Sequence, residues 1–162
     1  MPLIYADTST LLAFFHPRDI FAIMVTEAVR QASPDFIYWP FLRFELRHNL
    51  RAVRTDSFGD VAWRALRTAE KTATRLRWHA ELTADKMLEA AEELSGEHAG
   101  NHPCGGADFL HVAAARRMNS ISELDEFWTC DAAQAELARA AGLKARLFEE
   151  AKAGSRKNAQ KA

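Results

Sequence analysis

Short apolar runs alternate with longer segments of helical periodicity along almost the whole of this chain. Each run is too brief for a helix, and most are rich in the aromatic and β-branched residues that strands favour. Strands are therefore expected at 3–6, 36–39, 127–130 and 144–148. Because strands joined by helical crossovers build a parallel sheet with helices on both faces, we predict an α/β fold. Its short, mostly parallel sheet is expected to lie between two layers of helices.

The segments between these runs carry the helical pattern. Periodicity and capping residues predict helices at 11–15, 20–30, 41–54, 60–78, 83–94, 107–118 and 131–142. The third segment is the clearest, because Leu42, Leu46 and Leu50 fall on one apolar stripe. The fourth repeats such a stripe as far as Leu76, so one helix is expected there through Trp78.

Length and composition favour one domain at residues 1–150. A chain of 162 residues with 48% hydrophobic content can bury a core without disulfides. Residues 151–162 are basic and lack apolar periodicity, so we expect a disordered tail. The longest apolar run, 20–25, is far shorter than the roughly 20 residues that span a bilayer, and no signal peptide is recognisable. Two cysteines, Cys104 and Cys130, make no disulfide framework and are interpreted as structural, which favours a cytoplasmic protein.

The net charge of −1 hides an uneven distribution. Residues 43–77 hold nine Lys and Arg against four Asp and Glu, and residues 79–101 hold one Lys against six acids. Near-neutrality argues against bulk electrostatic binding of nucleic acid, but the basic stretch allows a local phosphate-contacting surface. A basic stripe of arginines at 43, 47, 51 and 54 lies opposite Glu45 on the helical wheel. It is interpreted as a solvated face or as a docking surface for a partner.

Four acids, far apart in the sequence, fall at strand ends or helix starts. Asp7 follows the first strand and Asp131 the third, whereas Glu45 and Asp108 lie in the first turns of helices. Because the carboxyl ends of parallel strands meet at one edge of the sheet, these carboxylates are expected to converge there. Converging carboxylates without Lys or Arg raise one another's pKa unless a metal neutralises them. Oxygen ligands select Mg²⁺, or Mn²⁺, over Zn²⁺.

Structural interpretations of the same acids stay open. Asp131 with Gln134 forms a capping box, and Asp7 can cap the first helix. Asp108 suits the positive end of its helix. Asp125 is an alternative to Asp131 as the fourth acid, and His111, one turn after Asp108, is expected to hydrogen-bond it.

The segments IYADTSTLLAFF, FLRFELRHNL, GGADFLHVAAARRM and FWTCDAAQAELARAAGL, in this order, resemble the four acidic segments of the PIN-domain family. The resemblance extends from residue 3 to about residue 147 and is to the VapC-like toxin ribonucleases of type II toxin–antitoxin systems. It implies a three-layer α/β/α PIN-like domain. It also implies metal-site acids, with hydroxyl side chains beside them: Asp7, Glu45, Asp108 and Asp131, with Ser9 and Thr129.

The same resemblance implies a function. We expect a Mg²⁺-dependent endoribonuclease that hydrolyses RNA phosphodiester bonds as the toxin of a toxin–antitoxin pair. It implies an antitoxin partner and a homodimer, for which the apolar segment 20–29 is a candidate interface. Two alternatives remain: a non-toxin PIN nuclease of RNA or DNA processing, and a PIN-like binding or regulatory module without nuclease activity.

Overall fold

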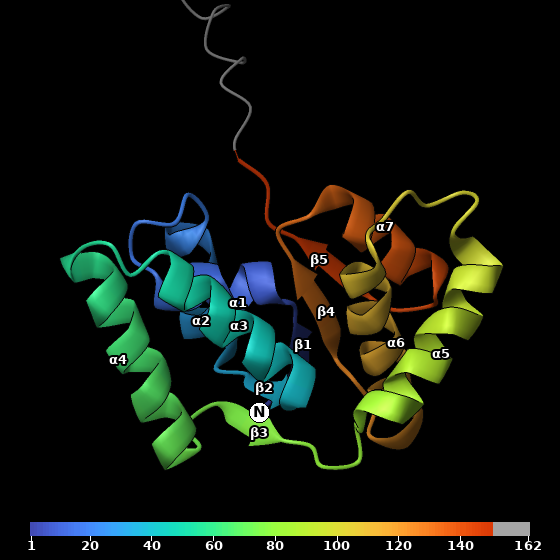
Figure 1. Cartoon of the computed structure of the whole chain (residues 1–162), viewed down its shortest axis with the longest axis horizontal. Helices are drawn as coiled ribbons and strands as arrows, with labels where there is room; N and C mark the ends of the chain where they lie inside the picture. Colours follow the sequence, from blue (N-terminus) through green and yellow to red (C-terminus); the bar gives the residue numbers. More distant parts are fainter. Residues whose placement is uncertain (151–162) are drawn as a thin grey trace, which may run out of the picture.

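A five-stranded parallel sheet forms the middle layer, with strand order β3-β2-β1-β4-β5 (Figure 1). The strands are β1 (Leu3–Ala6), β2 (Asp35–Tyr38), β3 (Leu76–Trp78), β4 (Glu126–Thr129) and β5 (Ala145–Leu147). The computed structural model describes residues 1–150, so the basic segment 151–162, for which the sequence predicts disorder, lies outside the described residues. Since every strand runs in the same direction, all the carboxyl ends lie along one edge.

Seven helices of the described chain cover the two faces of this sheet. On one side lie α1 (Thr8–Phe15), α2 (Ala22–Ala32), α3 (Pro40–Ala52) and α4 (Ser57–Thr72). On the other lie α5 (Ala84–His98), α6 (Gly106–Ile121) and α7 (Ala132–Ala140) (Figure 1). The expected three-layer α/β/α fold is confirmed. None of these helices combines the length and the apolar character that a membrane crossing requires.

One predicted element is wrong: the helix expected at 60–78 is two elements. Helix α4 ends at Thr72, and residues 76–78 form β3, which pairs in parallel with β2. Ala73 and Arg75 adopt left-handed backbone conformations, with φ of 51° and 60°, and these end the helix. The apolar stripe continued across this break, so periodicity alone did not reveal it.

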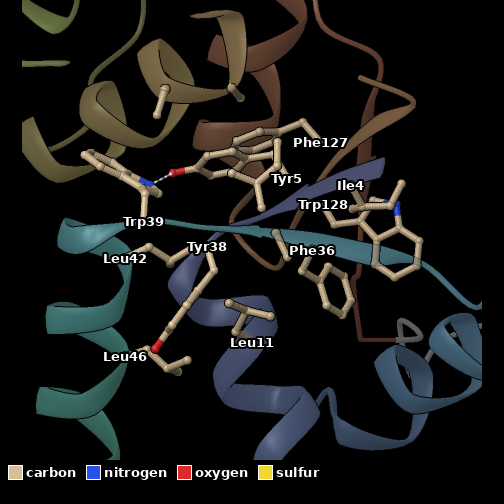
Figure 2. Packing of buried hydrophobic residues seen from close by; sticks show 14 of the residues in the cluster. Ile4, Tyr5, Leu11, Phe36, Tyr38, Trp39, Leu42, Leu46, Phe127 and Trp128 are labelled. Carbon is tan, nitrogen blue, oxygen red and sulfur yellow. Dashed lines mark hydrogen bonds between the residues drawn. The ribbon is translucent and has the colours of Figure 1, made fainter. Parts of the chain in front are cut away.

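Aromatic side chains dominate the core at the sheet (Figure 2). The largest fully buried side chains include Trp39, Trp128, Tyr5, Phe36 and Phe127. Tyr5 stacks on Phe127 with ring centroids 5.5 Å apart. Trp39 and Tyr5 meet on one face of the sheet, whereas Tyr38 and Phe36 point to the other (Figure 2). This packing fixes the strand ends from which the acidic side chains emerge.

Candidate active site

A cavity of about 360 Å³ opens where the carboxyl ends of the strands meet the first turns of the helices. It gathers residues from four separate parts of the chain. They are Asp7, Thr8, Ser9, Leu12, Glu45, Asn49, Asp108, His111, Asp131 and Gln134. All four predicted acids therefore line one cavity, and no Lys or Arg of residues 1–150 is among the lining side chains.

Asp7 is the most deeply placed of these acids, with only 4% of its surface exposed. It directly follows β1 and caps α1, accepting a hydrogen bond of 2.8 Å from the backbone N–H of Thr10. The hydroxyls of Ser9 and Thr129 each donate to it over 2.8 Å. Neutral donors thus hold this carboxylate in place, and Ser9 and Thr129 stand beside it as the resemblance implied.

A buried chain of hydrogen bonds leads to Glu45. The indole N–H of Trp39 donates to the Tyr5 hydroxyl over 2.8 Å (Figure 2). The same hydroxyl lies 3.0 Å from Nδ1 of His111, to which it can donate its own proton. Nε2 of His111 donates to Oε2 of Glu45 over 2.8 Å, because an ionised carboxylate can only accept. The Thr8 hydroxyl donates to the same carboxylate. His111 therefore bonds Glu45, and the expected bond to Asp108 is wrong.

Glu45 and Asp108, which both line the cavity, have opposite pKa shifts. Burial would raise the pKa of Glu45, but the hydrogen bonds from His111 and Thr8 outweigh it, so its pKa lies below the ordinary value. Burial raises the pKa of Asp108, and the charges of Asp131 and Asp7 add to the effect. The Gly105 N–H, which donates to Asp108 over 2.9 Å, opposes that rise only in part.

Asp131 is both a helix cap and a part of the cavity wall. Its carboxylate accepts a hydrogen bond of 3.0 Å from the backbone N–H of Gln134 and caps α7. The Gln134 side chain in turn donates to Asp108 over 3.2 Å, which links two of the acids. Asp125 precedes β4 and accepts from the Leu3 N–H at the opposite edge of the sheet. It is therefore no substitute for Asp131.

The chemistry of the donors suits a hard divalent cation. Four carboxylates line the cavity, and no Lys or Arg among the lining residues of 1–150 neutralises them. Among the residues that the structure describes, however, no three metal-binding side chains already stand in a ligand arrangement. Hydrogen bonds to neighbouring groups hold the carboxylates instead, so metal ligation by the four acids stays a prediction.

Other cavity residues were not predicted to line the site. Thr8 directly follows Asp7, and Gln134 was interpreted only as a capping-box partner. Asn49 and His111 lie one helical turn after Glu45 and Asp108. Spacing of three or four residues from an acid would have identified Asn49, His111 and Gln134, because such positions share a helix face. Cys130 lies behind the cavity, where burial raises the pKa of its thiol to about 11, as suits a structural cysteine.

Comparison with solved structures identifies the fold. The chain is similar to VapC20 of Mycobacterium tuberculosis, described as a Sarcin-Ricin loop cleaving toxin, with a TM-score of 0.63 and 19% identity over 86% of this chain and 95% of the other. It is also similar to VapBC2 of Rickettsia felis, solved with a DNA fragment from its promoter, with a TM-score of 0.59 and 13% identity over 90% and 98%.

A domain of a functionally unknown Methanocaldococcus jannaschii protein matches with a TM-score of 0.50 and 17% identity, covering 94% of each chain. No protein-family model matches, and no curated protein matches either. At these identities the likeness concerns the fold. The fold of residues 1–150 is the one seen in the VapC20 and VapBC2 structures.

Proposed function

We propose that this protein is a divalent-metal-dependent endoribonuclease that hydrolyses RNA phosphodiester bonds. The observation that carries the proposal is the convergence of Asp7, Glu45, Asp108 and Asp131 on one cavity without Lys or Arg in its lining. The fold shared with VapC20, a protein described as cleaving the Sarcin-Ricin loop, supports the choice of RNA.

The chain's own residues have distinct parts in this proposal. Asp7, Glu45 and Asp108 would hold Mg²⁺ or Mn²⁺, with Asp131 as a further ligand. A cation there supplies a Lewis acid that polarises water and stabilises charge on the phosphate. Ser9 and Thr129 keep Asp7 in place, and His111 orients Glu45. The lowered pKa of Glu45 keeps that ligand ionised at neutral pH.

A cleavage assay with Asp7→Asn tests the proposal. We expect wild-type protein to cut structured RNA with Mg²⁺ or Mn²⁺, to stop in EDTA and to recover when the metal is restored. Asp7→Asn should lose this cleavage because the buried site loses a charged ligand. Asp85→Asn, in the exposed first turn of α5, is the matched control and should cut normally.

The possible outcomes separate the candidate functions. Cleavage by Asp7→Asn at the wild-type rate would show that the proposed site is not the nuclease site. RNA binding without any cleavage by the wild type would favour the binding-module alternative. Cutting of single-stranded DNA in preference to RNA would favour a nuclease of DNA processing.

We further propose that the protein is the toxin of a type II pair, with an antitoxin partner, and that it forms a homodimer. The fold shared with VapC20 and with VapBC2 supports the toxin assignment. Growth arrest on expression, relieved by a neighbouring small reading frame, is the expected result. Ile20 and Ile23 are 66% and 86% exposed, which supports segment 20–29 as the dimer interface and can be checked by light scattering.

A further inference from the structure

A groove of about 910 Å³ lies between β3, α3 and α4. It lies on the flank of α3 that faces away from the catalytic cavity, because Arg43 and Arg47 line the groove and Glu45 lines the cavity. At 100° per residue, Glu45 is 200° from each of these arginines. The proposed metal site does not use this groove.

The groove has an excess of positive charge. Five cations line it against two acids: Arg43, Arg47, Arg67, Lys71 and Arg77 against Asp35 and Glu70. Glu70 pairs with two of the arginines, at 2.7 and 2.6 Å, and Asp35 pairs with a third at 2.8 Å. Within the described chain, Arg43 and Lys71 have no acidic partner. The groove therefore suits a ligand that carries negative charge.

An exposed aromatic ring stands in the same groove. Trp78 is 48% exposed at the carboxyl end of β3, although tryptophan is usually buried. The guanidinium of Arg43 lies 4.9 Å from its ring centroid, and Tyr38 packs edge-on against it. An aromatic platform with cations around it is the arrangement that binds single-stranded nucleic acid.

The parallel sheet places this platform at the same edge as the catalytic cavity. Trp78 is in register with Tyr38, and both end their strands at the edge where Asp7 follows β1. Helix α3, which separates the two sites, is about 10 Å across. A nucleic-acid strand advances about 3.4 Å per nucleotide even when stacked, so a few nucleotides bridge that distance.

We propose that this groove binds a single-stranded flank of the RNA substrate, with a base stacked on Trp78 and phosphates against Arg43 and Lys71. The proposal rests on the nuclease function proposed above and adds the contacts that hold RNA outside the cavity. An unpaired base is required, because bases within a duplex keep their faces stacked.

Binding of a labelled oligouridine to the full chain, measured by fluorescence anisotropy in EDTA, tests the groove without cleavage. Trp78→Ala is expected to weaken affinity about tenfold or more, since stacking on one aromatic side chain is worth that much. Lys71→Glu should also weaken affinity, because it places a negative charge against a phosphate. Lys86→Glu, at an exposed position on α5, is the matched charge control and should bind as the wild type does.

Tryptophan fluorescence supplies a second readout that a merely structural role would not change. Bound RNA should quench the exposed indole, and Trp78→Phe should lose this quenching while it retains most of the affinity. Lys71→Glu should also reduce the slope of log affinity against log salt by about 0.7, the contribution of one phosphate contact in a single strand.

Unchanged affinity in both Trp78→Ala and Lys71→Glu would overturn the proposal and leave the groove to a protein partner. An equal loss of affinity in Lys86→Glu would also overturn the proposal, because the effect would then depend on the net charge of the protein and not on the groove. Either result leaves the nuclease function intact if Asp7→Asn still abolishes cleavage. In the converse case, the groove variants weaken RNA binding as expected while Asp7→Asn still cleaves at the wild-type rate. That result would contradict the proposed catalytic site and support the groove.

Discussion

At the scale of single residues, the orientation of Glu45 depends on side chains that do not all contact it. The Trp39 N–H donates to the Tyr5 hydroxyl, this hydroxyl bonds Nδ1 of His111, and Nε2 of His111 donates to Glu45. All three side chains are almost fully buried. Tyr5 is accordingly a positioning residue for the proposed metal ligand.

Replacing Tyr5 by Phe tests this chain of hydrogen bonds. The ring can still stack on Phe127, but the Trp39 N–H and Nδ1 of His111 lose their partner. We expect the free energy of unfolding to fall by about 1–3 kcal/mol. We also expect kcat to fall more than KM changes, and ¹⁵N NMR to show a changed Nδ1 signal of His111, since that nitrogen loses its hydrogen bond.

Tyr38→Phe is the matched control. Its hydroxyl donates to Glu70 over 2.6 Å, on the other side of α3 from the cavity. Because Tyr38 lines the groove and not the cavity, this variant should lose stability but keep kcat at saturating RNA and the Nδ1 signal of His111. If Tyr5→Phe also keeps both, the hydrogen-bond chain does not position Glu45.

At this scale the sequence predicted where the acids lie, but not which side chains hydrogen-bond them. Asp7 and Glu45 could be assigned from strand ends and helix starts alone. The bond from His111 to Glu45 joins α6 to α3, and helical spacing instead favoured the neighbour in the same helix, Asp108. Contacts between elements depend on how the helices pack, which local periodicity does not report.

At the scale of elements, the close approach of α4 to the turn that follows α3 depends on Gly59. A Cβ atom there would lie 2.8 Å from the Cα of Arg54 and closer still to the carbonyl oxygen of Val53. Both obstacles are backbone, which cannot swing aside. We expect Gly59→Ala to lower the free energy of unfolding by about 1–3 kcal/mol, despite the better helix propensity of alanine.

Gly96 provides the contrasting case within helix α5. A Cβ there meets nothing within 4 Å, so Gly96→Ala should raise the free energy of unfolding by about 0.5–1 kcal/mol. Urea denaturation of both variants gives the comparison. A Gly59→Ala variant more stable than the wild type would show that α4 can move away from this turn without loss of stability.

The error at β3 also belongs to this scale. No glycine or proline interrupts residues 72–78, and alanine and arginine adopt the left-handed conformations that end α4. Such residues give no helix-stop signal in a sequence. The error bears on the proposed RNA groove, because only a strand at 76–78 brings Trp78 to the sheet edge beside Arg43.

At the scale of the whole molecule, the topology made the convergence of the acids predictable. All strands are parallel, so acids at strand ends and at the following helix starts must share one edge. The direction of each carboxylate was not predictable, because capping bonds and interhelix bonds compete for the same oxygens.

The clustering of acids in the cavity should lower the stability of the metal-free protein. Burial and the charges of Asp131 and Asp7 raise the pKa of Asp108, so its ionised form is disfavoured in the fold. Such a group lowers stability above its raised pKa, and the loss is relieved as pH falls through that value. Asp108→Asn should therefore raise the melting temperature of the metal-free protein by a few degrees at neutral pH.

With divalent metal bound, the wild type should have a higher melting temperature than Asp108→Asn, the reverse of the metal-free order. A cation that binds only the folded chain stabilises it in proportion to the logarithm of its concentration, so Mg²⁺ or Mn²⁺ should raise the melting temperature of the wild type. Asp108→Asn should lose most of this rise, whereas Asp85→Asn should keep it. Since this readout needs no substrate, it separates metal binding from catalysis. A wild-type chain whose melting temperature ignores both metals at millimolar concentration would contradict the metal site even if some cleavage were observed.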